Sequence, residues 1–396
     1  MAGEAPPNDL PGETLSRLSS PAERERLNAL FAELCAIASP SRRERACADR
    51  VVAELRDLGL EVEEDGAGAT IGGDTGNLLA RIPPPPGGDS ILLCAHLDTV
   101  PHGDVPIEPV IVDEGWENAN HAILGADNKA AVAVMLVAAR HAVEQGAPVG
   151  LELLFTPAEE EALAGAKELD ATRLRSRYGF VFDHASPIGE IVTASPTYYR
   201  LEVEFHGQAA HAGIRPEAGR SAIVAAARAI QSLSLGRLDA ETTANVGTIE
   251  GGPGGTNVVP DRCRFLAETR SLDPAKAERQ VAEMVDRVQD AANDTRCDVD
   301  VDVDVARLFD GFRQPPDAPQ IRAAERALRR AGYAPRHIVT GGGSDANALE
   351  AAGFPCTNLA NGTERNHEPT ERVAVSALEG MLDVTLALLE ECARDA

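Results

Sequence analysis

Lysine is nearly absent from this sequence, which has only Lys129, Lys167 and Lys276 among 396 residues. Arginine therefore supplies almost all of the positive charge. The 37 basic side chains are outnumbered by 63 acidic ones, which gives a formal net charge of −26. Binding to nucleic acid or to an anionic membrane requires a basic surface that displaces counterions. Because no basic run interrupts the acidic excess, we expect neither kind of partner.

Long apolar runs are also missing, and we expect no signal peptide. No stretch reaches 18 consecutive apolar residues, the length typical of a membrane-spanning helix. The first residues, MAGEAPPNDLPGETLSRL, have neither the basic nor the apolar region of a signal peptide. The seven cysteines are scattered without a C-x-x-C pair, which is typical of reduced core cysteines. We therefore expect a soluble, cytoplasmic protein.

The sequence also lacks a phosphate-binding loop. Neither G-x-x-x-x-G-K-[ST] nor G-x-G-x-x-G occurs between a strand and a helix, which disfavours a nucleotide-dependent enzyme. Glycine is nevertheless concentrated in two turns, 251–255 and 340–345. The second turn leads toward a helix, where backbone amides can bind an anion. We expect Gly342, Gly343 and Ser344 to bind a substrate carboxylate.

Length and periodicity predict an α/β protein with two domains. A single core seldom grows beyond roughly 250–300 residues. Short apolar runs bounded by turn residues alternate here with helical patterns, as in a sheet with parallel character. The expected strands are 77–82, 91–95, 151–155 and 178–182, and the helical segments are 22–59, 130–145, 320–331 and 376–392.

The pattern changes within residues 196–306. Strands are expected there at 199–205, 244–249, 263–269 and 298–305, with helices at 221–233 and 275–292. This β-α-β-β-α-β order is that of ferredoxin-like α+β domains. We therefore predict a catalytic domain with a mixed, largely parallel sheet, formed by residues 1–195 and 307–396. A ferredoxin-like domain, 196–306, is inserted into it.

Acidic and imidazole groups follow several of the expected elements, at the edge where open α/β sheets bind ligands. In ILLCAHLDTV, His96 and Asp98 share one face of a strand, and a carboxylate commonly orients a metal-binding imidazole. Taken singly, each group has a structural explanation, such as a helix cap or a solvated helix start. The others are Asp127 in GADN, Glu159, Glu160 and Glu161 after LELLF, Asp183 in GFVFDH, and His367 in NGTERNHEP.

A binuclear metal site explains why these groups occur together. Two divalent ions about 3.5–4 Å apart require several carboxylates and imidazoles, with one carboxylate bridging the ions. Asp127, Glu160 and Asp183 supply three negative charges, and a bridging hydroxide would supply the fourth. Ligands of nitrogen and carboxylate oxygen, without thiolate, suit zinc, cobalt or manganese. We therefore expect two divalent ions, with zinc as the first choice.

The sequence resembles a family of co-catalytic dizinc peptidases that includes peptidase T (aminotripeptidase), carboxypeptidase G, aminoacylase and succinyl-diaminopimelate desuccinylase. HAGIRPEAGRSAI and GGGSDAN are most similar to the peptidase T branch. The resemblance spans nearly the whole chain, in ordered motifs. These are HLDTV, GADNKAA, FTPAEE, FDH, HAGIRPEAGRSAI, TNVVPD, AETRS and GGGSDAN, followed by the His367 loop.

The resemblance implies a set of metal ligands. His96, Asp127 and Asp183 would bind one ion. Asp127 would bridge to the other ion, which Glu160 and His367 would also bind. The family further implies a cis peptide bond after the bridging aspartate, between Asp127 and Asn128.

Two carboxylates next to the ligands receive other roles from the resemblance. Glu159 would be the general base that deprotonates the bridging water, and Asp98 the carboxylate behind His96. The chain departs from the family at Glu161-Ala162, where a glycine often follows the second glutamate by two residues. The additional acid, Glu161, could crowd the metal edge.

The inserted domain is expected to carry residues that act on the substrate. His211 lies where the family places an oxyanion-stabilising histidine, and Asn257 and Arg270 match substrate-contacting positions. In isolation each would pass for an ordinary polar residue. The resemblance also implies that this domain serves as a lid, or as a dimerisation domain through which a homodimer forms.

These expectations predict a dinuclear metallopeptidase that hydrolyses short peptides and is aminotripeptidase-like. An N-acyl amino acid deacylase or a carboxypeptidase would use the same metals and the same base. A non-catalytic metal-binding or assembly protein would lack a ligand or the base, and none is missing from the sequence.

Overall fold

The computed structural model describes residues 18–103 and 105–394. Within them the chain divides into two compact units. Unit 1 contains the described residues up to Thr193, the segment Gln314–Ile338, and the described residues from Ser344 onward. Unit 2 contains Ala194–Arg313 and Val339–Gly343. Unit 2 is therefore inserted into unit 1 along the sequence.

A mixed nine-stranded sheet confirms the predicted α/β class, and its strands lie in unit 1 except for Phe312–Arg313 and the strand ends at 194–195 and 339. Parallel pairing joins its four central strands in the order β6, β3, β7 and β18, whereas β1, β2, β8 and β16 pair in antiparallel fashion. Parallel character is thus confined to the middle of the sheet. In spatial order the strands are β1 (Val62–Glu64), β2 (Leu78–Ile82), β6 (Gly150–Thr156), β3 (Ser90–His96), β7 (Gly179–His184), β18 (Cys356–Ala360), β8 (Glu190–Ser195) and β16 (Phe312–Arg313), and β17 (Arg336–Val339) pairs with β8.

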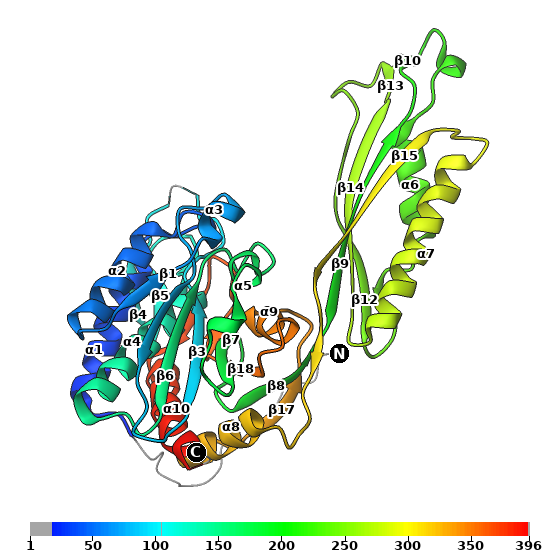
Figure 1. The fold of residues 1–396 in the computed structure, drawn as a ribbon. Coiled ribbons are helices and arrows are strands. Elements are labelled where there is room, and N and C mark those ends of the chain that lie inside the picture. The colour runs from blue at the N-terminus through cyan, green and yellow to red at the C-terminus, as the bar shows by residue number, and fades with distance from the viewer. Residues whose placement is uncertain (1–17, 104, 395–396) are drawn as a thin grey trace. The chain divides into compact units, whose positions relative to one another are not determined.

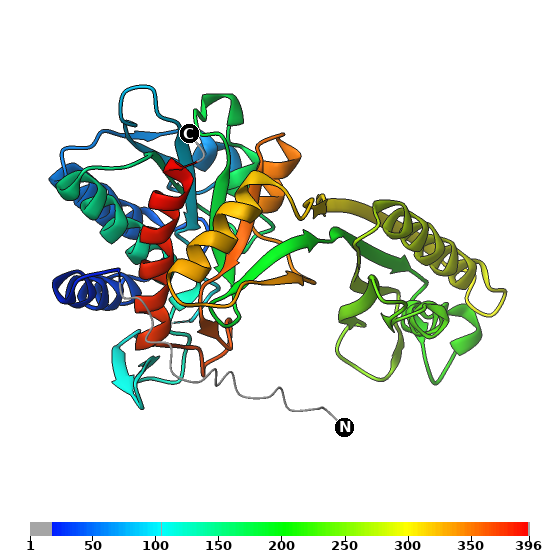
Figure 2. The ribbon, with the colours of Figure 1, turned by 90° about the horizontal axis from the view of Figure 1, so that it is seen from below.

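Helices cover both faces of this sheet (Figures 1 and 2). On β3, Ile91, Leu93 and Ala95 pack into the hydrophobic core with α4, whereas Cys94 approaches Asp345 of α9. Because side chains alternate along a strand, His96 follows Cys94 onto the α9 face. The helices of unit 1 are α1 (Pro21–Cys35), α2 (Arg45–Asp57), α3 (Ala67–Ile71), α4 (Ala126–Gln145), α5 (Ala164–Lys167), α8 (Pro319–Arg330), α9 (Asp345–Ala351) and α10 (Val375–Ala393).

A second, four-stranded sheet in unit 1 supports the loop that contains His367. Its strands are ordered β19-β20-β5-β4, and all three pairings are antiparallel. Strands β19 and β20 form a hairpin whose loop, 365–371, carries His367. The sequence did not predict these strands, which are β4 (Pro109–Val112), β5 (Gly115–Asn118), β19 (Thr363–Glu364) and β20 (Arg372–Ala374).

Unit 2 is an antiparallel sheet with two helices on one face (Figure 1). Along the chain its main elements follow the predicted β-α-β-β-α-β order. In space the strands lie in the order β11-β12-β14-β9-β15, and α6 and α7 pack on β9 and β14. The bounds are β9 (Thr197–His206), β10 (Ala210–His211), α6 (Ala222–Ser232), β11 (Gly236–Arg237), β12 (Thr242–Gly251), β13 (Val258–Val259), β14 (Arg262–Ser271), α7 (Pro274–Asn293) and β15 (Asp300–Phe309).

Local sequence signals determine where several helices begin. Ser20 and Glu23 form a capping box at the start of α1, which has proline at its first position. The Asp273 side chain accepts a hydrogen bond from the N–H of Ala275 at the start of α7. Across residues 18–103 and 105–394, no helix is both long enough and apolar enough to cross a membrane.

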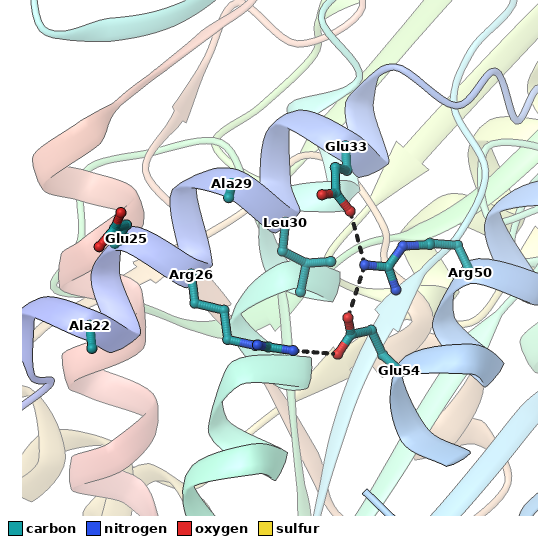
Figure 3. Close-up of a pocket in the computed structure, with 8 residues that line it drawn as sticks. All are labelled: Ala22, Glu25, Arg26, Ala29, Leu30, Glu33, Arg50 and Glu54. Atoms are coloured by element: carbon teal, nitrogen blue, oxygen red, sulfur yellow. Dashed lines mark hydrogen bonds and ion pairs between the residues drawn. The ribbon is translucent and has the colours of Figure 1, made fainter. Parts of the chain in front are cut away.

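Helices α1 and α2 enclose a surface hollow of about 360 Å³ (Figure 3). The Nη2 atom of Arg50 lies 2.9 Å from both the Glu33 and the Glu54 carboxylates. Arg26 donates a second hydrogen bond to Glu54, at 3.0 Å. These hydrogen bonds pair both arginines that line the hollow with Glu33 and Glu54, and we assign no ligand to it.

Candidate metal centre

The predicted metal ligands lie in unit 1, on separate segments of the chain that meet at the carboxyl ends of β3 and β7. His96 is the last residue of β3, and Asp183 is the next-to-last residue of β7. Asp127 lies in the first turn of α4, and Glu160 lies in the loop after β6. His367 comes from the β19–β20 hairpin loop. Because β3, β6 and β7 run parallel, their loops emerge at the same edge of the sheet.

His96 is buried among carboxylates. Its Nε2 atom lies 3.2 Å from Oδ1 of Asp127 and 3.7 Å from Oδ1 of Asp183. Its Nδ1 atom lies 3.0 Å from the backbone carbonyl oxygen of Asp98, and a carbonyl oxygen can only accept. Nδ1 therefore carries a proton, and Nε2, which faces the two carboxylates, is the nitrogen that can bind a metal.

Asp127 lies between the two imidazoles. Its Oδ1 atom is next to His96, and its Oδ2 atom lies 3.4 Å from Nε2 of His367. The same His367 nitrogen is 2.8 Å from Oε1 of Glu160. Asn366 donates a hydrogen bond to Oδ2 of Asp127 at 2.8 Å. The peptide bond from Asp127 to Asn128 is cis, as the family resemblance implies. One carboxylate thus has an imidazole on each of its two oxygens.

Asp98 does more than lie behind His96. Its carboxylate is 3.3 Å from Nδ1 of His96, and it also accepts the backbone N–H groups of Glu159 and Glu160, at 2.9 and 3.2 Å. The Ser41 hydroxyl donates to the same carboxylate at 2.7 Å. Asp98 therefore holds the loop that contains Glu159 and Glu160 against the end of β3.

Glu161, the acid that departs from the family pattern, points to Arg42 and not to the other ligand candidates. The Arg42 guanidinium lies 2.6 Å from the Glu161 carboxylate, and both side chains are nearly half exposed. Exposed ion pairs stabilise a fold by only about 0–1 kcal/mol. The pair therefore determines where the charge of Glu161 points and contributes little to stability.

Burial and mutual repulsion dominate the ionisation of the site. Burial, together with the charge on Asp127, raises the pKa of Asp183 to about 8. Burial and the charge on Asp183 raise the pKa of Glu159 well above its usual value. Hydrogen bonds that its imidazole donates to Asp127 and Glu160 raise the pKa of His367 to about 10. In the protein without metal, protonated imidazoles and protons on the acids therefore balance the charge.

The residues fit a pair of divalent cations. Two overlapping groups have ligand atoms within 4.8 Å of one another: His96, Glu159 and Asp183 form one, and His96, Asp127 and Glu160 form the other. The donors are imidazole nitrogens and carboxylate oxygens, the set that zinc, cobalt and manganese accept. Gathering this many buried acids is costly unless positive charge is bound among them.

Three buried carboxylates near the site were not singled out from the sequence. Glu371 accepts backbone N–H groups from the turn that carries Asp127. Glu44 accepts the N–H of Ala158, the residue before Glu159. Asp345 accepts from the Thr156 hydroxyl and has one oxygen without a hydrogen-bond partner. Their partners lie far along the chain, and no local pattern distinguishes them from surface acids.

Without metal, the protein should lose stability as the pH rises from about 4 to about 8. The folded-state pKa is raised to about 8 for Asp183 and to about 7 for both Glu44 and Glu371, against about 4 in the unfolded chain. Burial is the largest cause of each shift. Acids whose pKa is raised by folding bind more protons in the folded state, so stability falls as they ionise. Thermal melts with a chelator at pH 5.5 and 8.5 test this, and a melting temperature that rises with pH would contradict it.

The three predicted substrate contacts of unit 2 lie on different parts of that unit. His211 is exposed in β10, and its Nδ1 atom accepts the N–H of Gly213 at 3.2 Å. Asn257 is exposed, and its backbone carbonyl oxygen accepts a hydrogen bond from the N–H of Ala212. Arg270 forms an ion pair with Glu268 at 3.2 Å and lies over the ring of Tyr198. His211 and Asn257 are therefore close in the fold, whereas Arg270 already has partners.

The glycine-rich turn uses two of its three predicted anion-binding amides internally. The N–H of Gly342 donates to the Thr340 hydroxyl at 3.0 Å, and the N–H of Ser344 donates to Oδ1 of Asn347 at 3.1 Å. A substrate carboxylate would have to displace these acceptors to use both amides. Binding of a carboxylate by Gly342, Gly343 and Ser344 stays a prediction.

Comparison with known proteins places this arrangement in a family. The sequence model of "Peptidase family M20/M25/M40" matches residues 92–391. "Uncharacterized protein YqjE" of Bacillus subtilis is 35% identical over 371 residues, covering 93% of this chain and 99% of that protein. Among solved structures, aminopeptidase PepT from Bacillus cereus shares 38% of its sequence with this chain and superposes with a TM-score of 0.83. The match covers 93% of this chain and 99% of that one. A tripeptidase from Staphylococcus aureus has 31% sequence identity and a TM-score of 0.88, and the match covers 94% of this chain and 99% of that one. This chain therefore belongs to the peptidase family M20/M25/M40.

Proposed function

We propose that this peptidase hydrolyses short peptides in the manner of an aminotripeptidase. The observation that carries the proposal is the meeting of His96 and His367 on the two oxygens of Asp127, with Asp183 and Glu160 beside them. The solved PepT and tripeptidase structures, which match 93% and 94% of this chain, support the choice of substrate.

Two divalent ions, with zinc as the first choice, would be held by the five predicted ligands. One ion would take His96 and Asp183, the other Glu160 and His367, and Asp127 would contact both. When bound, such ions supply Lewis acidity and lower the pKa of water toward neutrality. The oxygen and nitrogen donors of this site satisfy the ligand preference of zinc.

Glu159 would move the proton. Its backbone N–H is bound by Asp98, and its side chain is buried beside His96 and Asp183. A buried carboxylate held at this place can take a proton and later return it. Glu159 would accept a proton from the attacking water and deliver it to the leaving amine.

His211 would stabilise the negative charge that develops on the scissile carbonyl oxygen. We expect His211→Ala to lose about 10²- to 10³-fold in kcat, the scale of one oxyanion donor, while metal content stays unchanged. His206 is a matched control on the same unit, because its Nε2 atom is bound by Asp302 at 2.9 Å. Steady-state kinetics of both alanine variants decide the role, and a fully active His211→Ala protein would remove His211 from the mechanism.

Whether His211 acts within its own chain depends on assembly. We propose a cytoplasmic homodimer that forms through unit 2, with His211 supplied by the partner or by closure of the same chain. Mixing His211→Ala chains with Glu159→Gln chains separates the two sources. Recovered activity requires one intact site built from two subunits, and no recovery supports action within one chain.

The substrate class is tested by metal analysis followed by a chelator-sensitive screen. Tripeptides, dipeptides and N-acyl amino acids are compared, each with and without a free amino terminus. The proposal expects cleavage of tripeptides that requires the free amine. Preference for N-acyl amino acids would instead support a deacylase, and release of carboxyl-terminal residues from blocked peptides would support a carboxypeptidase.

A further inference from the structure

Helix α4 begins without a cap of its own. Its N-cap residue is Gly125, which has φ +76°, a left-handed conformation that favours glycine. Glycine has no side chain to accept a hydrogen bond, and no local side-chain cap is formed. The first backbone N–H groups of a helix have no partners within the helix and need external acceptors.

Glu371, from a distant part of the chain, accepts hydrogen bonds from the second N–H group of the helix and from two N–H groups of the turn before it. Its Oε2 atom accepts the N–H groups of Leu124 and Gly125, at 2.9 and 2.8 Å. Its Oε1 atom accepts the N–H of Asp127 at 2.9 Å. The side chain is 2% exposed, so these three donors take the place of water.

The same contact links two segments that carry predicted metal ligands. Glu371 and His367 lie in one hairpin loop, and Asp127 lies in the turn that Glu371 holds. Asn366 of that loop also donates to the Asp127 carboxylate at 2.8 Å. The backbone and the side chain of Asp127 are therefore both held by residues of the loop that carries His367.

We propose that Glu371 is a positioning residue for the metal centre, acting through the backbone of Asp127. It holds the bridging carboxylate and the His367 loop at a fixed separation. The inference rests on the proposed dimetal function of these residues. Groups that orient metal ligands typically contribute about 10- to 100-fold to metal affinity.

Glu371→Gln tests this with a nearly isosteric change. An amide offers one acceptor oxygen and one donor nitrogen, so its NH₂ group must face either Asp127 or the Leu124 and Gly125 amides, donor against donor. We expect the dissociation constant for Co²⁺ or Zn²⁺, measured by chelator competition, to rise about 10- to 100-fold. The visible absorption spectrum of the cobalt-saturated protein should change as well, because the bridge is displaced.

Asp383→Asn is the matched control. Asp383 is also a buried carboxylate that accepts backbone N–H groups, from Leu18 and Ser19 at 3.0 and 2.7 Å, but it lies on α10. The Asp383→Asn substitution should lower the melting temperature and leave the metal dissociation constant and the cobalt spectrum unchanged. This separates loss of stability from loss of ligand geometry.

The outcomes are distinct. A folded Glu371→Gln protein with wild-type cobalt affinity and spectrum would make Glu371 a purely structural cap and overturn the proposal. If that variant does not fold, Glu371→Asp is used, which keeps the carboxylate on a side chain that is one methylene shorter. Wild-type metal binding by the Glu371→Asp protein overturns the proposal equally. Failure of the unaltered protein to bind cobalt would instead refute the proposed dimetal function, on which the inference rests.

Discussion

Glu159→Gln should reduce turnover by about 10²- to 10⁴-fold, the usual contribution of a general base, while the protein still binds two ions. Glutamine keeps the size of the side chain but cannot accept a proton at neutral pH. The backbone N–H of residue 159 still donates to Asp98, so the loop should keep its position. Steady-state kinetics and metal analysis of the same preparation provide the measurement.

Glu161→Gln is the control for this experiment. Glu161 lies two residues further along the same loop, and its substitution makes the same chemical change as Glu159→Gln. Its partner is Arg42, and its carboxylate is partly exposed. Near-normal activity is expected, since an exposed ion pair contributes at most about 1 kcal/mol. Loss of metal from Glu159→Gln would make Glu159 a ligand, and retained activity would exclude it as the base.

His96→Ala should deplete the protein of metal and abolish activity. His96 is almost fully buried, and it is the predicted imidazole ligand of its ion. Its removal leaves Asp127 and Asp183 facing each other without the group that lies 3.2 and 3.7 Å from them. Metal analysis after dialysis gives the occupancy, and normal stoichiometry would remove His96 from the site.

His367→Ala should lose the other ion under the same conditions. The His367 side chain is half exposed, so its ion should exchange faster with a chelator than the ion at buried His96. His337→Ala is the control for both variants, because His337 is paired with the Glu325 carboxylate at 2.9 Å on the surface of unit 1. That variant should keep both ions and full activity.

Elements with long periodic patterns could be predicted from the sequence. The apolar run at 91–95 is the interior of β3, and the amphipathic pattern at 275–292 falls within one or two residues of α7. Burial of both faces leaves a continuous apolar run in β3, whereas burial of one face leaves a helical period in α7. His96, Glu160 and Asp183 could be noticed because they lie at or just beyond the ends of such strands, whereas the full ligand set, with Asp127 and His367, followed from the family resemblance.

Short strands with distant partners could not be predicted in this way. β5 and β20 are four and three residues long, and they pair although they are far apart in the sequence. A pattern of that length carries no periodicity. The partners of Glu371 are missed for the same reason, since its role depends on backbone donors contributed by another segment. A single acid among 63 gives no local sign of this.

The interrupted course of unit 1 delays completion of the centre during synthesis. His96 and Asp127 leave the ribosome early, but His367 and Glu371 follow only after all of unit 2 has been translated. His367 is 271 residues downstream of His96, which at about 5–20 residues per second corresponds to about 15–55 s of translation. Throughout that interval a nascent chain carries only part of the ligand set. Peptide cleavage would therefore begin only after unit 2 has been translated and has had time to fold.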